Sequence, residues 1–423
     1  MEERKTWDLI AIASIPLIMT LGNSMLIPVL PSIRDKLGIT SLQVSLLITV
    51  YSAVAILLIP LAGYLSDRFG RKKIIIPSLL ITAAGGLVSG LGAWWLDQSY
   101  MVIMLGRLLQ GVGAAGAFPI VLPLVGDMFK NEDDVSSGLG IVETANTFGK
   151  VLSPVLGSAL AMAVWFLPFL AIPVLCIIST VLVAFLVKTP KKEDDEANQE
   201  QATLRAFFTQ IKQIFKENGR WLYAIFGIGG ICMLVIFGIL FYLSDLLEDN
   251  YHIEGILKGC ILAIPLAFLC LASFITGKII KKNMTLMKWL TFAGMSLVAL
   301  SLLWDGFIYS AALILIISIC FMGIGVGIAL PCLDAMITES IEKQQRGTIT
   351  SIYSSMRFIG VAAGPPLASL LIKLSPSVMF FTMAGCSAFA VLLALFGLKP
   401  KEKNRGQGQS LHIFPLRIKQ KIK

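Results

Sequence analysis

Long apolar runs alternate with short polar segments along almost the entire chain. Each run is about 20 residues long, the length at which a helix crosses the roughly 30 Å hydrocarbon core of a bilayer. The runs are continuously apolar and do not alternate as the strands of a membrane barrel do. The pattern predicts an all-α membrane protein with twelve transmembrane helices, at residues 9–30, 42–65, 74–94, 101–124, 138–161, 164–187, 221–243, 256–276, 286–304, 308–331, 348–372 and 377–398.

Charged segments divide these runs into two sets of six. One charged segment separates the sixth run from the seventh, and a basic segment follows the last run. We therefore predict four regions: an N-terminal six-helix bundle over residues 1–187, a cytoplasmic linker over 188–220, a C-terminal six-helix bundle over 221–398 and a basic cytoplasmic tail over 399–423.

The two sets of six helices share sequence landmarks. Gly111 and Pro119 in the first half correspond to Gly323 and Pro331 in the second half, at a constant separation of 212 residues. Repeated six-helix halves around a central site are the architecture expected for alternating access. The repeat therefore predicts two pseudo-symmetric halves.

Composition excludes several classes of protein. Hydrophobic residues make up 56% of the chain and charged residues only 14%, against about a quarter charged in soluble domains. Twelve crossings leave no room for a soluble catalytic domain, so we do not expect an enzyme. The cysteines are scattered within apolar runs and the two histidines lie outside them, so we expect no metal site and no cofactor.

Lysine and arginine side chains predict the orientation. If the N-terminus is cytoplasmic, most of the 35 lysines and arginines lie on the cytoplasmic side, and the outer loops hold only Arg34, Lys36, Lys258 and Lys373. This asymmetry predicts a multi-pass protein of the cell membrane with both termini in the cytoplasm. The net charge of +9 follows from this topology, so we expect no nucleic-acid partner.

Four charged side chains lie well inside the apolar runs: Arg107, Glu143, Lys150 and Arg357. A charge at this depth is costly unless it is paired or wetted, so such residues normally border a water-filled path or a bound solute. Three of the four are positive, and this surplus favours an anionic or polyphenolic solute.

Glu143, Asn146 and Lys150 share one face of the fifth helix, because their spacings are three and four residues. Glu143 is the only carboxylate that our boundaries place well within the membrane, and no histidine lies there. It is therefore our candidate for proton coupling. The alternative is that Glu143 is a structural partner of Lys150 or Arg357.

We predict a substrate-binding set that combines these polar residues. Asn23, in the outer half of the first helix, is included because an amide within the membrane needs hydrogen-bond partners. The set consists of Asn23, Arg107, Asn146, Lys150 and Arg357.

The segment GYLSDRFGRKK, from Gly63 to Lys73, resembles the loop signature of the major facilitator superfamily. The resemblance implies a cytoplasmic gate in which Asp67 contacts the N-terminal end of the eleventh helix. A plain positive-inside signal is the alternative, which accounts for the basic residues but not for the glycines or Asp67. The gating residues implied are Gly63, Asp67, Arg68, Gly70, Arg71 and Lys72.

The fourth run contains LGRLLQGVGAAGAFPI, which is similar to the arginine motif of twelve-span drug:proton antiporters in that superfamily. The resemblance implies that Arg107 assists proton transfer, or holds the substrate cavity. As an alternative, Arg107 braces the fold through backbone carbonyl groups.

The fifth run contains ETANTFGKVLSPVLGS, which resembles the G-x-x-x-G-P-x-x-G-G motif of the same antiporters. Ser153 and Ser158 stand where the motif has glycines, but small residues still recur at every fourth position, which permits close helix packing. The predicted helix-packing residues, including those of the second-half copy, are Gly149, Ser153, Pro154, Gly157, Gly360, Gly364 and Pro365.

We expect a proton-coupled exporter of small amphipathic molecules that works by alternating access. Within the antiporter family the chain resembles siderophore exporters of the bacillibactin type, and a catecholate anion suits Arg107, Lys150 and Arg357. The alternatives are a broad multidrug efflux antiporter, a nutrient proton symporter and a membrane sensor without flux. We expect a monomer whose partners are a small-molecule substrate, protons and the lipid bilayer.

Overall fold

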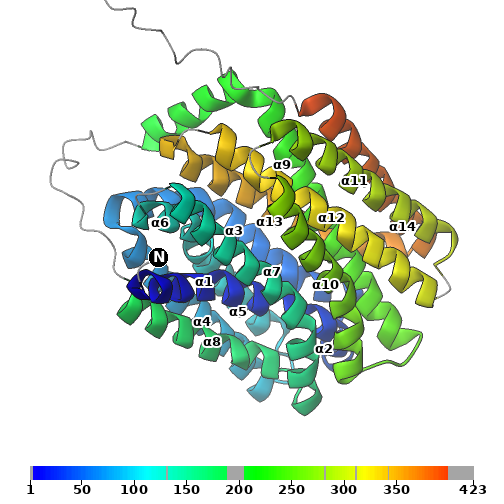
Figure 1. Cartoon of the computed structure of the whole chain (residues 1–423). Coiled ribbons are helices and arrows are strands. Elements are labelled where there is room, and N and C mark those ends of the chain that lie inside the picture. Colours follow the sequence, from blue (N-terminus) through cyan, green and yellow to red (C-terminus); the bar gives the residue numbers. More distant parts are fainter. Residues whose placement is uncertain are drawn as a thin grey trace, which may run out of the picture.

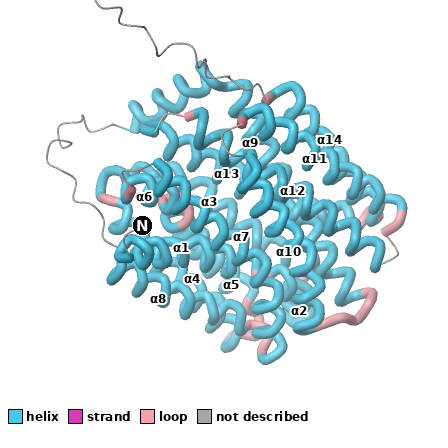
Figure 2. The backbone as a smooth tube through the Cα atoms, viewed as in Figure 1, coloured by secondary structure: helices cyan, strands magenta, loops and turns pink. Residues whose placement is uncertain are grey.

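Helices account for nearly all of the structure. The computed structural model describes residues 3–129, 132–187, 204–280, 283–309, 312–341 and 343–398. These residues contain no β-strand, and their helices run back and forth through one bundle (Figures 1 and 2). The expected all-α membrane fold is confirmed.

The described residues of the N-terminal half form six helical segments. The first consists of α1 (Glu3–Ser24), the short turn η1 (Ile27–Val29) and α2 (Leu30–Leu37). The others are α3 (Ser41–Phe69), α4 (Arg71–Trp95), the broken pair α5 (Tyr100–Ala117) and α6 (Val121–Met128), α7 (Glu132–Ala163) and α8 (Leu167–Leu186). Pro28 and Pro119 lie at the two breaks, because proline lacks the amide hydrogen that continues a helix.

The described residues of the C-terminal half also form six helical segments. They are α9 (Leu204–Asp249), α10 (Gly255–Ile280), α11 (Met284–Phe307), α12 (Ala312–Ser340), α13 (Lys343–Ile372) and α14 (Pro376–Leu392), which continues into the π-helical turn η3 (Leu393–Gly397).

Membrane-crossing character is clear for all but one segment. Within the described residues, eleven segments are both long and apolar enough to cross a membrane. The twelfth, α7, is less apolar because it carries Glu143, Asn146 and Lys150. It packs against α1 and α10, so these polar side chains are kept away from lipid. The expectation of twelve transmembrane helices is consistent with this arrangement.

The two halves lie side by side and contact each other through pairs of helices. Figure 1 shows the N-terminal half in blue to blue-green and the C-terminal half in green through yellow to red-orange. Across the boundary, α3 packs against α13 and α7 packs against α10. Thr49 Oγ1 of α3 donates a hydrogen bond to the Ala362 carbonyl of α13 at 2.7 Å.

Small residues of α7 permit close contact with the first span. A Cβ atom at Gly157 would lie 2.0 Å from the Met25 carbonyl oxygen, and one at Gly149 would lie 3.0 Å from a carbonyl oxygen of α1. Ser153 Oγ donates to the Gly149 carbonyl at 2.5 Å, so this hydroxyl is satisfied within its own helix. The Pro154 carbonyl lies on the other side of α7, against α10.

The second-half copy of the packing motif lies between α13 and α9. A Cβ atom at Gly360 would lie 2.0 Å from the Gly230 carbonyl oxygen, and one at Gly364 would lie 2.6 Å from the Leu234 carbonyl oxygen. Pro365 lies inside α13, one residue after Gly364. Both copies of the motif therefore lie where two backbones approach closely.

Several helices extend beyond the apolar runs that predicted them. α12 continues to Ser340, past the predicted end at Pro331, and α9 begins at Leu204, within the predicted linker, and continues to Asp249. Residues 188–203 of that linker and the predicted tail at 399–423 lie outside the described residues.

The bundle has two ends, and each is named after an arginine that lies there. The Arg71 end contains the turn between α3 and α4, and the Arg34 end contains α2 and the turn between α9 and α10.

Candidate transport cavity

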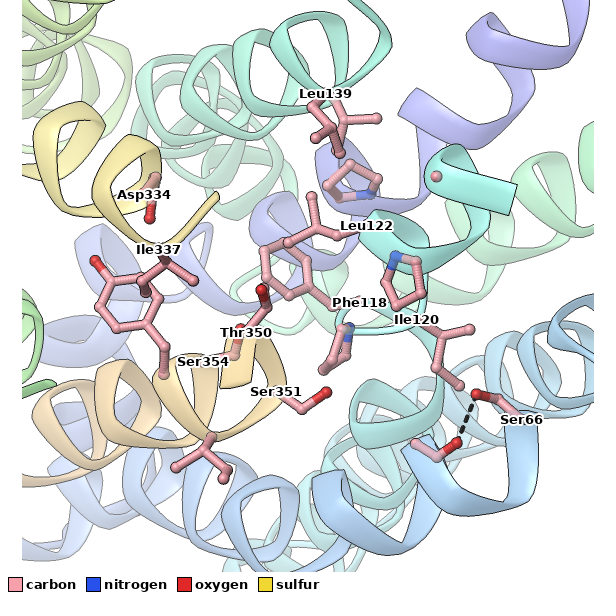
Figure 3. A pocket seen from close by; sticks show the side chains of 18 of the residues that line it. Ser66, Phe118, Ile120, Leu122, Leu139, Asp334, Ile337, Thr350, Ser351 and Ser354 are labelled. Carbon is pink, nitrogen blue, oxygen red and sulfur yellow. Dashed lines mark hydrogen bonds between the residues drawn. The ribbon is translucent and has the colours of Figure 1, made fainter. Parts of the chain in front are cut away.

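A cavity of about 260 Å³ lies between the two halves and reaches the Arg71 end. We call it the wide cavity. Figure 3 shows Phe118 and Leu139 from the N-terminal half and Asp334 and Thr350 from the C-terminal half around the same space. Both halves therefore contribute to its wall, as a central transport site requires.

Asp334 and Arg357 form an ion pair in the wall of the wide cavity. Arg357 Nη1 in α13 lies 3.7 Å from Asp334 Oδ1 in α12, and the two side chains are 13% and 32% exposed. The expectation that Glu143 is the only carboxylate well inside the membrane is wrong, because α12 continues beyond Pro331. The surplus of positive charge is correspondingly smaller than the sequence indicated.

Glu143 lines the same cavity from α7. Its Oε1 accepts a hydrogen bond from Asn146 Nδ2 at 3.1 Å, and Asn146 Oδ1 accepts one from Thr20 Oγ1 of α1 at 2.6 Å. This chain of bonds links the carboxylate to the first span. Among the described residues, Glu143 makes no ion pair with Lys150 or Arg357, which was the alternative role.

A second cavity of about 70 Å³ lies beside the wide one. We call it the inner cavity. Phe118, Ser354 and Arg357 line both cavities, so the two are neighbours. Asn146 and Lys150 line the inner cavity from α7.

The inner cavity collects most of the predicted substrate-binding set. Asn23, Asn146, Lys150 and Arg357 all line it, although they come from three helices of the two halves. The Lys150 side chain is buried, with only 8% of the residue exposed. Within the part of the chain that the structure describes, its ammonium group makes neither a hydrogen bond nor an ion pair.

Arg107, the fifth member of the set, is completely buried and lines neither cavity. Its guanidinium donates to the Leu47 carbonyl at 2.9 Å, to Gln110 Oε1 at 2.5 Å and to Asn23 Oδ1 at 2.6 Å. It also lies over the Tyr51 ring, 4.5 Å from the centroid. Such contacts suit the alternative interpretation, in which Arg107 holds neighbouring helices together.

The predicted gating residues surround the wide cavity at the Arg71 end. Arg71 forms ion pairs with Asp67 and with Asp127, whose Oδ2 lies 3.1 Å from the guanidinium. It also donates a hydrogen bond to Ser66 Oγ at 2.8 Å. Gly63 faces α13: a Cβ atom added at Gly63 would lie 3.8 Å from the Ser351 hydroxyl oxygen. This charged network lines the wide cavity together with Thr350 and Ser351 of α13.

The remaining gating residues shape the turn itself. Gly70 has a φ of 103°, a backbone conformation that favours glycine. Lys72 Nζ donates to two carbonyl groups at the end of α8, at 2.7 and 2.8 Å, where a cation complements the helix dipole. Arg68 lies over the adjacent Phe69 ring.

The Arg34 end is closed by polar contacts between the halves. Arg34 of α2 donates to both carboxylate oxygens of Asp249 in α9, at 2.7 and 3.1 Å, and lies 3.8 Å from Asp245. Ser244 Oγ of α9 donates to the Ile27 carbonyl at 3.1 Å.

A buried ion pair supports this closure. Lys258 of α10 pairs with Glu248 of α9, and Glu248 accepts a further hydrogen bond from Ser32 of α2 at 3.1 Å. The expectation that Lys258 lies in an outer loop is wrong, because it lies in the first turn of α10, within the predicted run 256–276, and only 2% of it is exposed.

The sequence prediction missed Asp334, Asp245 and Glu248 because these acids lie just beyond the runs that end at 243 and 331. Lys258 lies at the start of the run 256–276 and was counted with the outer loop before it. The acids of α9 do recur at helical spacing, so extending the helix would have grouped them on one face.

Comparisons with known proteins agree with this geometry. The chain matches the family model described as Major Facilitator Superfamily over residues 12–320 and 288–421. It is 52% identical over 407 residues to the bacillibactin exporter of Bacillus subtilis (strain 168), covering 94% of this chain and 99% of that protein. It is 25% identical to multidrug resistance protein 2 of the same organism, over 88% of this chain and 90% of that protein.

Solved structures share the fold. One is a bacterial homolog of the human lysosomal transporter Spinster, in an inward-facing and unoccupied conformation, with a TM-score of 0.72, 14% identity, and coverage of 94% of this chain and 96% of that chain. Another is the human organic anion transporter MFSD10, with a TM-score of 0.68, 16% identity, and coverage of 93% and 100%.

Two six-helix halves with polar cavities between them define a multi-pass membrane transporter of small molecules. The chain belongs to the major facilitator superfamily.

Proposed function

We propose that this transporter exports an anionic catecholate siderophore of the bacillibactin kind in exchange for protons. The observation that carries the proposal is that two cationic side chains, Lys150 from one half and Arg357 from the other, line the inner cavity, and the described residues give Lys150 no ion pair. The name of the relative that is 52% identical supports the substrate class. No cofactor enters the proposal, because the proton gradient supplies the driving force.

The proposed orientation places the Arg71 end and both chain termini in the cytoplasm of the cell. The wide cavity then faces the cytoplasm, while the contacts of Arg34 close the outer side. This is the conformation in which an exporter loads its substrate. Asp67 and Arg71 would exchange partners with the start of α13 when the cytoplasmic side closes.

Proton coupling is proposed to use the carboxylates of the wide cavity. A catechol hydroxyl donates a strong hydrogen bond to an ionised carboxylate, whereas a proton on that carboxylate turns one oxygen into a donor and leaves a weaker, neutral acceptor. Substrate and proton therefore compete at Glu143, which is what exchange requires. Asp334 is a second candidate, and Arg107 acts as a positioning residue that orients Asn23.

A flux measurement tests the coupling. Purified protein in vesicles is given a pH gradient and bacillibactin, and its accumulation is compared with the variants Glu143→Gln and Asp334→Asn and with the exposed control Asp97→Asn. We expect gradient-driven flux in the parent and in the control, and its loss in Glu143→Gln. Unchanged coupling in both cavity variants would remove the proposed proton sites.

Broad multidrug efflux is the second candidate function. The sequence relationship to multidrug resistance protein 2 and the four carboxylates that line the wide cavity, Asp67, Asp127, Glu143 and Asp334, favour it, because acidic cavities suit lipophilic cations. In the same vesicles, ethidium would be transported in place of bacillibactin if this candidate is correct.

A further inference from the structure

The inner cavity has an aromatic wall and a polar wall. Four aromatic rings and two thioethers contribute to its lining. The polar groups come mainly from α1 and α7, whereas the rings come from α3, α9, α13 and the end of α5. The apolar lining consists mainly of Met19, Tyr51, Phe118, Met233, Phe237 and Phe358.

Two rings from opposite halves meet where the cavities adjoin. The Phe118 and Phe358 centroids lie 6.4 Å apart with the rings at 82°, an edge-to-face contact. Phe118 lines both cavities and follows the end of α5, at the break that Pro119 imposes. Phe358 also lies 6.3 Å from Tyr51. The rings therefore form an aromatic boundary between the wide cavity and the inner cavity.

Lys150 supplies the charge. It lines the inner cavity, is more than nine-tenths buried and has no ion pair or hydrogen bond among the described residues. Arg357 differs, because Asp334 already balances it. Glu143 and Asp334 act on this ammonium group only through space, without a direct contact. A buried ammonium without a directly bonded anion is costly, and an anionic group on a ligand would reduce that cost.

We propose that the inner cavity is a subsite for a single anionic aromatic ring. The ring passes the boundary formed by Phe118 and Phe358, packs against these side chains, and its negative substituent pairs with Lys150. The remainder of a larger solute stays in the wide cavity, which has more than three times the volume. This inference rests on the proposed function only in that the cavities form the transport path.

Equilibrium binding to the purified full-length protein in detergent tests the subsite. The probes are 2,3-dihydroxybenzoate and cyclohexanecarboxylate, which share a carboxylate and a six-membered ring but differ in aromatic character. The variants are Phe358→Leu, Phe118→Leu and Lys150→Met, and Phe389→Leu, on the exposed face of α14, is the matched control. Phe358→Tyr keeps an aromatic ring at the boundary.

We expect the parent protein, the control and Phe358→Tyr to prefer the aromatic probe. Each Phe→Leu change at the boundary should weaken the binding of 2,3-dihydroxybenzoate about three- to tenfold and leave the binding of cyclohexanecarboxylate nearly unchanged. The reason is that contacts between aromatic rings add about 0.5–1.5 kcal/mol beyond the area they bury. Lys150→Met should weaken the binding of both probes equally.

The inference is overturned if the parent shows no aromatic preference, or if the preference persists in both Phe→Leu variants. Parent protein that binds 2,3-dihydroxybenzoate selectively but moves no bacillibactin in vesicles would instead overturn the proposed function and leave the subsite intact. Thermal unfolding of each variant shows whether it is folded, and Phe358→Tyr gives a folded comparison if a leucine variant is not.

Discussion

Arg34 and Asp249 join the two halves of the transporter through two hydrogen bonds at the end opposite the wide cavity. Arg34 belongs to α2 and Asp249 to the last turn of α9, so the pair must separate if the bundle opens at this end. It therefore contributes to the stability of one conformation and not of the other.

We predict that Arg34→Gln shifts the population toward conformations open at the Arg34 end. A partly exposed ion pair contributes about 1 kcal/mol, so the ratio of the two conformations should change about fivefold. Distances between spin labels on α2 and on the α9–α10 turn measure the shift. Lys36→Gln removes an exposed neighbouring charge and should leave the distances unchanged, and equal distributions in both variants would contradict the prediction.

Lys258→Met should destabilise the folded protein by about 3–5 kcal/mol, because it leaves the Glu248 carboxylate buried without its partner. The double variant Lys258→Met with Glu248→Met removes both charges and should recover most of the loss. Thermal unfolding in detergent measures both. A double variant no more stable than the single one would show that the pair is not the cause.

Gly360→Ala should destabilise the packing of α13 on α9 by about 1–3 kcal/mol, because the added methyl group would overlap the Gly230 carbonyl. Gly385→Ala is the matched control, since a Cβ atom at Gly385 in α14 meets nothing within 4 Å. The control should be neutral or slightly stabilising. Unfolding temperatures distinguish the two, and equal effects would argue against close packing at Gly360.

Arg107→Lys should lower stability and transport together. A lysine cannot reproduce the planar geometry with which Arg107 contacts Leu47, Gln110 and Asn23. Each hydrogen bond from a charged group that is lost costs about 1.5–3 kcal/mol. Unfolding and flux are measured on the same preparation. Normal stability combined with altered proton coupling would instead support a direct role of Arg107 in proton transfer.

The sequence by itself determined the class of fold. Twelve apolar runs, the repeat of glycines between the halves and the segment from Gly63 to Lys73 were sufficient, because hydrophobic length and helix-turn chemistry are local properties. The polar face of α7 could be predicted for the same reason, since the spacing of Glu143, Asn146 and Lys150 sets their side of the helix.

Only the tertiary structure decided which charges meet and which face a cavity. Arg107 and Arg357 look alike in sequence, yet the first is bonded on all sides and the second lines two cavities. Asp334 and Lys258 each pair with a residue on a neighbouring helix, and the sequence of one helix gives no information about such a pair. The physical reason is that burial and pairing depend on how helices pack, whereas the apolar pattern records only that they cross the membrane.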